Sequence, residues 1–236
     1  MKNLKIKIFS DGADVNEMEK ASQNGLIKGF TTNPTLMKKS GITDYEKFAK
    51  EAILKVNNLP ISFEVFSDDF ENMEKEAVKI SGWGENVYVK IPITNTKSDS
   101  SVDLIKFLDR KGIKLNITAI LTLKQVQDLF NALNEKSKSI ISVFAGRIAD
   151  TGVDPVPIMK EAKSILFPKR NLELLWASSR ELLNIFQAQE CGCDIITVTN
   201  DLLKKLNMVG MDLGDLSLDT VKMFYNDAKS AGYKIL

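Results

Sequence analysis

Short apolar runs alternate with amphipathic stretches from one end of the chain to the other. The runs are almost unbroken, which is typical of strands buried on both faces of a parallel sheet. They lie at Ile6–Phe9, Leu26–Phe30, Ile61–Val65, Val87–Ile91, Leu115–Thr118, Ile140–Phe144, Leu172–Ala177 and Ile195–Val198. Eight strand–helix units predict an α/β fold, a closed (β/α)8 TIM barrel, although a doubly wound open sheet would show the same alternation.

Helical patterns fill the intervals between the runs. Between the second and third runs, apolar residues recur at helical spacing, namely Phe48, Ala52, Ile53 and Val56. Two capping-box patterns each predict the start of a helix, one at Thr122–Gln125 and one at Ser178–Glu181. The last amphipathic stretch, Leu218–Ala231, predicts an additional C-terminal helix that caps the barrel or reaches a neighbouring subunit.

Length and charge limit the possible organisation and partners. The 236 residues are close to the roughly 250 of one barrel, so we expect a single domain over residues 1–236. The 32 basic and 31 acidic residues leave a net charge of +1 and form no tract of one sign. We therefore expect neither nucleic acid nor an anionic membrane as a partner.

The sequence also predicts the compartment. No apolar run reaches the roughly 20 residues that cross a bilayer, and the N-terminal segment alternates charged and apolar side chains, unlike a signal peptide. Cys191 and Cys193 are too close together for a comfortable structural disulfide. We expect a reduced, cytoplasmic protein.

The chain contains no histidine. This removes Ser-His-Asp and Cys-His catalysis, and it removes the commonest transition-metal ligand, so we expect no metal. There is also no Walker loop and no Gly-x-Gly-x-x-Gly, so nothing points to a nucleotide cofactor. Acid–base chemistry must therefore use carboxylates, lysines, tyrosines or water.

Polar residues recur where the predicted strands end, which favours a barrel because those ends form its catalytic face. In chain order they are Asp11, Thr31–Pro34, Glu64, Lys90, Asn116, Thr118, Ser142, Arg147, Ser178, Arg180, Thr197 and Thr199. Several also have simpler interpretations. Asp11 is also typical of a turn, and Arg147 and Arg180 are typical of surface charges. Thr32–Pro34 and Ser178 are typical of helix N-termini.

Glu64 and Lys90 each interrupt an apolar strand. An ionised group in such a place must be paired or must face a polar cavity, so one interpretation is a structural buried ion pair. The other is a nucleophilic amine. Burial favours neutral Lys90, which can attack a ketone and form an iminium that withdraws electrons. The nearby carboxylates have the opposite effect, because negative charges favour the protonated, charged amine.

Neighbouring groups fit the cleavage of a carbon–carbon bond next to such an iminium. Glu64 would transfer protons directly or through a water held by Thr118, and Asp11 would take the proton of the hydroxyl at the breaking bond. Sugar hydroxyls would be bound by Asn33, Asn116 and Ser142. A terminal phosphate would be held by Arg147, Ser178 and Arg180.

These segments resemble the small-subunit transaldolases and the related fructose-6-phosphate aldolases over essentially the whole chain. The matching segments are Phe9–Asp11, Gly29–Thr35, Val87–Pro92, Asn116–Thr118, Ser142–Ile148 and Ala177–Arg180. The Thr-Thr-Asn-Pro segment together with a lysine-bearing strand is highly specific, whereas each segment alone is weak.

The resemblance implies a role for each matched residue. Lys90 would form the Schiff base, Glu64 and Thr118 would hold the catalytic water, and Asp11 would transfer the proton at the breaking bond. Substrate binding would involve Thr32, Asn33, Asn116, Ser142, Phe144, Arg147, Ser178 and Arg180. The family implies phosphorylated sugar substrates, no metal or organic cofactor, and a homo-oligomer, such as a pentamer or decamer, in which the C-terminal helix crosses to a neighbour.

Two positions indicate the branch of the family, and two others concern the choice of acceptor substrate. The aldolase branch tends to have glutamine at the position of Glu64 and tyrosine at that of Phe144, so both residues favour the transaldolase branch. The chain departs from the family at Ser179, usually phenylalanine, and at the bulky Trp176. Both lie beside the expected phosphate site and would bear on the choice of acceptor.

The sequence thus predicts a transaldolase that moves a dihydroxyacetone unit from a ketose phosphate, such as fructose 6-phosphate, to an aldose phosphate. An aldolase that releases free dihydroxyacetone is the first alternative. A sugar-phosphate-binding barrel that has lost turnover is the second, and the presence of Asp11, Glu64 and Lys90 together argues against it.

Overall fold

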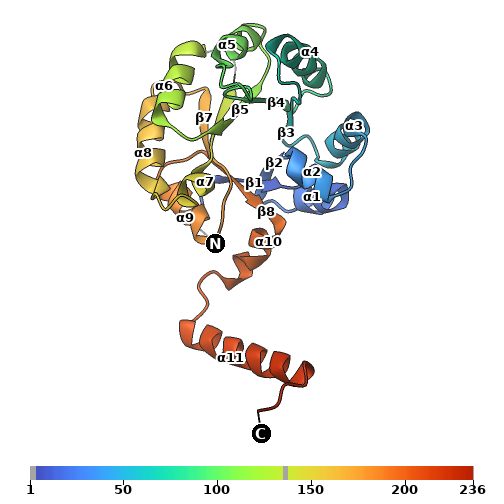
Figure 1. The fold of residues 1–236 in the computed structure, drawn as a ribbon, viewed down its shortest axis with the longest axis vertical. Helices are drawn as coiled ribbons and strands as arrows, with labels where there is room; N and C mark the ends of the chain where they lie inside the picture. Colours follow the sequence, from blue (N-terminus) through green and yellow to red (C-terminus); the bar gives the residue numbers. More distant parts are fainter. Residues whose placement is uncertain (1–3, 135–137, 236) are drawn as a thin grey trace.

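Eight parallel strands follow one another in chain order around a closed barrel in the computed structural model, which describes residues 4–134 and 138–235 (Figure 1). They are β1 (Lys7–Asp11), β2 (Ile27–Thr31), β3 (Ile61–Glu64), β4 (Val87–Pro92), β5 (Leu115–Ile120), β6 (Ser139–Val143), β7 (Leu172–Trp176) and β8 (Ile195–Thr199). The barrel prediction is confirmed, because β1 pairs with β8 as well as with β2, whereas an open sheet would have two edge strands with one neighbour each. Residues 1–3, 135–137 and 236 of the predicted domain lie outside the described residues.

Helices between the strands pack around the outside of the barrel (Figure 1). They are α1 (Val15–Gln23), α2 (Pro34–Lys39), α3 (Tyr45–Lys55), α4 (Phe70–Ser81), α5 (Val102–Arg110), α6 (Leu123–Ala132), α7 (Ala145–Ala149), α8 (Pro155–Leu166) and α9 (Leu183–Glu190). The chain ends with α10 (Asn200–Leu203), the 3-10 helix η1 (Lys204–Met208) and α11 (Leu213–Ser230).

One of the two predicted capping boxes is confirmed and the other is wrong. Thr122 and Gln125 form a reciprocal capping box at the start of α6. Ser178 caps no helix, since α9 begins only at Leu183. Ser178 has a φ of 63°, in the left-handed region, whereas an N-cap residue needs an extended backbone to aim its side chain at the helix.

Apolar side chains fill the middle of the barrel below the carboxyl ends of the strands. They are Phe9, Tyr88, Ile140, Leu175, Ala177 and Ile195, with Phe144 packed against them. Gly29 makes room for the Phe9 ring, because a Cβ at this position would lie 2.5 Å from it. Residues two places further along β1, β4 and β6 point the same way. Asp11, Lys90 and Ser142 therefore stand on an apolar floor.

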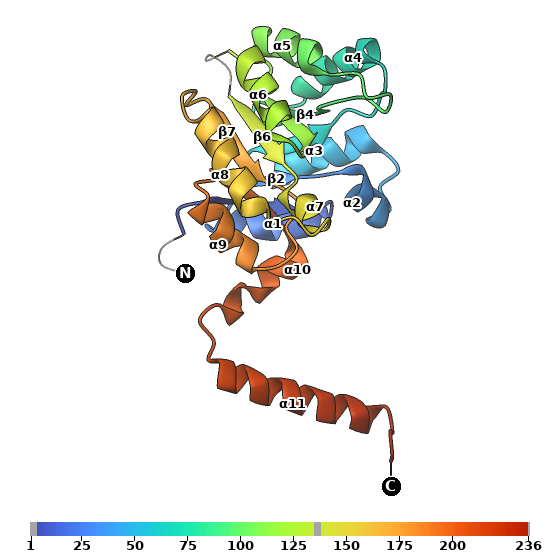
Figure 2. The same ribbon diagram turned by 60° about the vertical axis from the view of Figure 1, so that its left-hand side comes forward.

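The C-terminal helix α11 extends away from the barrel (Figure 2). It begins at Leu213 rather than near Leu218, because Asp212 caps it by accepting hydrogen bonds from Gly214 N and Asp215 N. None of its residues is buried in the single chain. Within the described ranges, no helix has the length and apolar character needed to cross a membrane.

Candidate active site

The carboxyl ends of the strands surround a cavity of about 380 Å³. Ten of the predicted site residues line it, namely Asp11, Asn33, Glu64, Lys90, Asn116, Thr118, Ser142, Phe144, Arg147 and Ser178. This is the face at which the active sites of TIM-barrel enzymes lie. Thr32 and Arg180 are the predicted residues that do not line the cavity.

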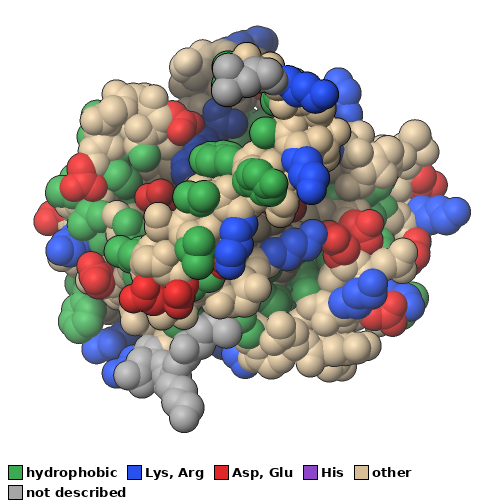
Figure 3. All heavy atoms as spheres, turned by 90° about the horizontal axis from the view of Figure 1, so that it is seen from below, with side chains coloured by type: hydrophobic (Ala, Val, Ile, Leu, Met, Phe, Trp, Pro, Cys, Tyr) green, Lys and Arg blue, Asp and Glu red, His purple; other side chains and the backbone are tan. Residues whose placement is uncertain are grey.

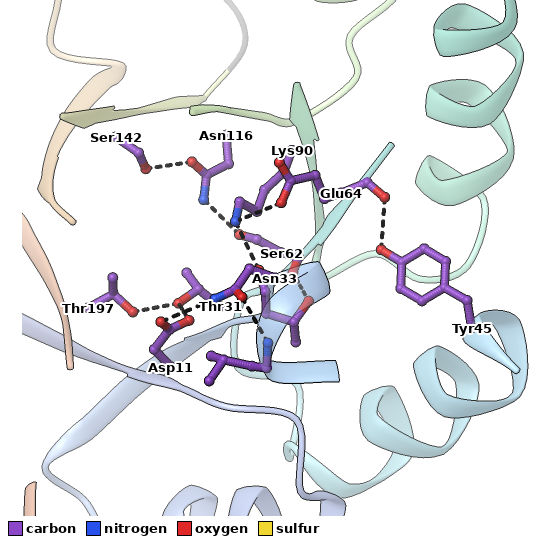
Figure 4. Close-up of polar contacts among 12 residues, drawn as sticks. Asp11, Thr31, Asn33, Tyr45, Ser62, Glu64, Lys90, Asn116, Ser142 and Thr197 are labelled. Carbon is purple, nitrogen blue, oxygen red and sulfur yellow. Dashed lines mark hydrogen bonds and ion pairs between the residues drawn. The ribbon is translucent and has the colours of Figure 1, made fainter. Parts of the chain in front are cut away.

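Lys90 is buried in the wall of the cavity, with 7% of its surface exposed. Its Nζ donates a hydrogen bond to the carbonyl oxygen of Thr32 at 2.8 Å and lies 3.2 Å from Glu64 Oε2 (Figure 4). Lys90 and Glu64 are partners in the β3–β4 register, which places the amine and the carboxylate side by side. The pair faces the cavity, so a bound carbonyl can reach the amine.

The backbone of Glu64 is anchored from outside the barrel. Tyr45 on α3 donates a hydrogen bond from its hydroxyl to the Glu64 carbonyl oxygen at 2.9 Å (Figure 4). Burial raises the pKa of Tyr45, so the phenol remains a donor. The ring packs edge-on against Phe63 and Trp83. This cluster fixes the end of β3 and with it the direction of the Glu64 side chain.

Asp11 is held at the end of β1 by polar neighbours. Thr31 Oγ1 donates to Asp11 Oδ1 at 2.7 Å, and Asn33 Nδ2 lies 3.5 Å from Oδ2. Burial raises the pKa of the Asp11 carboxyl, and Lys90 and the Thr31 hydrogen bond offset this in part. A carboxylate with a raised pKa is a better proton acceptor, which suits a general base.

Asn116 is oriented by a chain of hydrogen bonds across three strands. Ser142 Oγ donates to Asn116 Oδ1 at 2.6 Å, and Asn116 Nδ2 donates to Ser62 Oγ at 3.0 Å (Figure 4). The carbonyl end of the amide accepts and the amino end donates, so this pattern sets the direction of the side chain. Asn116 and Ser142 line the cavity, where they can bind sugar hydroxyls.

A bulge in β5 shapes another part of the wall. The β5–β6 register shifts between Ile117 and Ile120, and Ala119 has a φ of 61°. Such a bulge changes the direction of nearby side chains. As a result both Thr118 and Ala119 line the cavity. The apolar run gave no sign of the bulge, so Ala119 was missed.

The placement of Thr32 corrects the sequence prediction. Thr32 is fully buried and its Oγ1 donates to the Ser62 carbonyl oxygen at 3.1 Å, away from the cavity. Thr31 lines the cavity instead, opposite Asp11 in the β1–β2 register, and its hydroxyl contacts that of Thr197. Strand alternation could have identified Thr31, because adjacent residues point to opposite faces.

The predicted phosphate-binding residues are only partly brought together. Arg147 and Ser178 line the cavity, but Arg180 does not. The guanidinium of Arg180 pairs with Asp150, with Nε 2.9 Å from Oδ1, and this lowers the pKa of the Asp150 carboxyl. Both side chains are about half exposed, so the pair is weak and can be broken by a competing anion.

Trp176 and Ser179 do not reach the cavity, contrary to the expectation that they lie beside the phosphate. Trp176 is fully buried among the apolar side chains between the barrel and its helices. Ser179 Oγ donates to the Thr197 carbonyl oxygen at 3.0 Å. Neither residue is therefore placed to select the acceptor by direct contact.

A closed barrel with a buried lysine–carboxylate pair, and with amide and hydroxyl side chains around the same cavity at its carboxyl face, is typical of a TIM-barrel protein of the aldolase type. The family model described as "Transaldolase/Fructose-6-phosphate aldolase" matches residues 8–235, and the chain belongs to this family. Membership supports aldolase-type activity on sugar phosphates.

Curated relatives cover most of the chain. A protein named "Probable transaldolase" from Thermoanaerobacter sp. (strain X514) is 34% identical over 98% of this chain and 100% of its own length. Another with this name, from Thermoplasma volcanium, is 35% identical over 85% of this chain and 87% of its own length. "Probable transaldolase 2" from Listeria monocytogenes is 35% identical over 85% of this chain and 88% of its own length.

A solved structure shares the fold alone. Dihydrodipicolinate synthase from Rhodopseudomonas palustris superposes with a TM-score of 0.53 at 13% identity, over 83% of this chain and 72% of that one. The likeness supports the barrel architecture.

Proposed function

We propose that this protein is a class I transaldolase that moves a dihydroxyacetone unit from a ketose phosphate of the fructose 6-phosphate type to an aldose phosphate. The observation that carries the proposal is the buried amine of Lys90, held in the cavity 3.2 Å from the Glu64 carboxylate. Among the described residues that line the cavity, this side chain is the one amine that can form a covalent bond to a ketone carbon.

The first half of the reaction forms and cleaves an imine. Glu64 takes a proton from the Lys90 ammonium, and the neutral amine attacks the C2 carbonyl of the ketose. Loss of water, with protons passed through Glu64 and a water held by Thr118, gives the iminium. Asp11 then accepts the proton of the C4 hydroxyl, the C3–C4 bond breaks, and its electron pair neutralises the iminium to an enamine. The aldehyde product leaves.

The second half reverses these steps on a different aldehyde. The enamine carbon attacks the carbonyl of the acceptor, and Asp11 returns its proton to the new hydroxyl. Water then adds to the iminium, and the new ketose phosphate is released from Lys90. Asn33, Asn116 and Ser142 hold the hydroxyls, and Phe144 forms part of the wall. These steps use only side chains and water, so they need no metal or organic cofactor.

Release of free dihydroxyacetone is the second candidate. It requires protonation of the enamine before an acceptor arrives. The ring of Phe144 lines the cavity and has no proton to donate, which favours transfer over release. A barrel without turnover is the third candidate, and the arrangement of Asp11, Glu64 and Lys90 around one cavity supports a working site instead.

A transfer assay distinguishes the candidates. With fructose 6-phosphate and erythrose 4-phosphate together, we expect formation of a seven-carbon ketose phosphate and glyceraldehyde 3-phosphate. With fructose 6-phosphate alone, glyceraldehyde 3-phosphate should stop after about one equivalent per site. Continued production without an acceptor would establish the aldolase, and no product in either case would establish the barrel without turnover.

We also propose that the protein acts in the cytoplasm as a homo-oligomer. Cys191 and Cys193 are free, and burial raises the pKa of both thiols, which suits a reducing compartment. Figure 3, which views the molecule from the end where α11 lies, shows hydrophobic side chains exposed there. On α11 these include Leu218, Val221, Phe224 and Tyr225. Contact with a neighbouring subunit would bury them.

A further inference from the structure

The loop after β7 lies directly against the first turn of α7. Ser178 in this loop and Arg147 in α7 both line the cavity, from two different elements. Gly146 precedes Arg147, and its N–H donates to the Ala177 carbonyl oxygen at 3.3 Å. The two segments that carry the proposed phosphate-binding side chains are therefore in backbone contact.

Position 146 has no space for a side chain. A Cβ there would lie 1.6 Å from the carbonyl oxygen of Ser178 and 2.7 Å from its carbonyl carbon. Both atoms belong to the backbone, so no change of rotamer relieves the overlap. Any larger residue at position 146 would push the loop away from α7.

The loop cannot easily yield, because Ser178 is fixed from its C-terminal side. Ser178 has a φ of 63°, which is rare for serine. Ser179 Oγ donates to the Thr197 carbonyl oxygen at 3.0 Å, and Arg180 N donates to Asn184 Oδ1 at 2.8 Å. Backbone strain of this kind persists only where the surrounding structure enforces it, and it concentrates at functional sites.

We propose that Gly146 is a positioning residue for the phosphate end of the cavity. Its bare Cα lets the Ser178 loop close against α7, so that Ser178 and Arg147 face the same group of the substrate. The proposal rests on the proposed function, which makes that group a sugar phosphate. Lys90 comes from β4, which is not adjacent to β7 in the barrel. A change at position 146 should therefore weaken phosphate binding and spare imine formation.

The test compares Gly146→Ala with Gly25→Ala, a matched control because a Cβ at position 25 would meet nothing within 4 Å. Binding of inorganic phosphate is measured by calorimetry. The KM for fructose 6-phosphate and the kcat are measured at a fixed concentration of erythrose 4-phosphate, and imine formation is measured by borohydride trapping of dihydroxyacetone, which carries no phosphate. Folding is checked by thermal unfolding.

Gly146→Ala should weaken phosphate binding and raise KM by roughly tenfold or more, the effect of losing a hydrogen bond to a charged group. Half-maximal trapping by dihydroxyacetone should stay unchanged, and Gly25→Ala should match the wild type in every assay. Ser179→Ala removes the hydrogen bond between the loop and Thr197 without adding atoms, so it should also weaken phosphate binding. It provides the test if Gly146→Ala does not fold.

The proposal would be overturned if a folded Gly146→Ala kept the phosphate affinity of the wild type. It would also be overturned if Gly146→Ala lost phosphate binding and dihydroxyacetone trapping to the same extent. Absence of phosphate binding by the wild type would overturn it too. The proposed function fails in a different way. If the wild type is not trapped by dihydroxyacetone while Gly146→Ala still loses phosphate affinity, the imine is refuted and the positioning role stands.

Discussion

Single side chains in this barrel carry charges that an apolar wall would ordinarily exclude. Lys90 and Glu64 face each other across β3 and β4, and Asp11 lies on the same cavity. Lys90 also donates to the Thr32 carbonyl oxygen and Asp11 accepts from the Thr31 hydroxyl, whereas the Glu64 carboxylate pairs with Lys90. Charges kept in such a place indicate chemistry more than stability, because buried ion pairs stabilise proteins little.

Glu64→Gln separates catalysis from a structural ion pair. If Glu64 transfers protons, kcat should fall by about 10²–10⁴-fold while the fold remains. If the pair mainly holds the barrel together, its loss should cost about 3–5 kcal/mol of unfolding free energy. Urea unfolding and steady-state kinetics on the same preparation decide between the two, with Glu173→Gln, which breaks the Lys7–Glu173 pair outside the cavity, as the matched control.

Asp11→Asn should lower activity and raise stability at neutral pH. Burial raises the pKa of Asp11 above its ordinary value of 3.8, so the folded protein holds this proton more tightly than the unfolded chain. The stability that the protonated carboxyl contributes is complete below the ordinary pKa of 3.8 and is lost as pH rises through the folded pKa. The amide of the variant does not titrate, so the variant avoids this loss.

The measurement for Asp11→Asn is urea unfolding at pH 7 and near pH 3. The variant should have the higher unfolding free energy at pH 7, and the difference should shrink at low pH. A variant less stable than the wild type at pH 7 would show that the Thr31 and Asn33 hydrogen bonds outweigh the burial of the charge.

Secondary-structure elements could be predicted from the apolar pattern, whereas the turns between them could not. All eight runs overlap the observed strands, because a strand buried on both faces must be apolar throughout. The bulge at Ala119 arises where β5 meets β6, and the left-handed Ser178 lies where the loop after β7 meets α7; no local pattern reports such contacts. Likewise, the pairing of Arg180 with Asp150 depends on where two loops meet.

Gly29→Ala tests the floor of the site at the level of its elements. The new Cβ would lie 2.5 Å from the Phe9 ring, so β1 and β2 must shift or the ring must leave its place. We expect a loss of about 1–3 kcal/mol of unfolding free energy, as for other overpacked cores. Phe9→Leu in the same chain should recover part of it, and no recovery would place the strain elsewhere.

The whole molecule presents a closed barrel and a C-terminal helix that extends beyond it. The barrel strands and the loops and short helices after them supply the cavity residues, whereas α11 leaves Leu213, Val221, Phe224 and Tyr225 exposed. The sequence pattern indicated an amphipathic helix here but not whether it packs on the barrel or extends from it. Helical spacing identifies an apolar face, but it does not identify the surface that covers this face. We propose that contacts between subunits bury the apolar face of α11.

Val221→Asp should reduce the size of the assembly and leave the barrel folded. A charge in a buried subunit contact is costly, while on a solvent-exposed helix it is nearly neutral. Light scattering coupled to size-exclusion chromatography measures the mass. Leu54→Asp on α3, where the side chain is 83% exposed, is the control and should keep the wild-type mass. An unchanged mass for Val221→Asp would refute the assignment of α11 to subunit contacts.

The covalent role of Lys90 is tested most directly by borohydride reduction during exposure to fructose 6-phosphate, followed by peptide mass analysis. We expect a reduced three-carbon adduct on Lys90 that is absent from Lys90→Met. Lys163→Met should keep the adduct, because Lys163 also pairs with a carboxylate, Asp194 at 2.6 Å, but lies outside the cavity. An adduct on a different lysine, or turnover that persists in Lys90→Met, would refute a covalent role for Lys90.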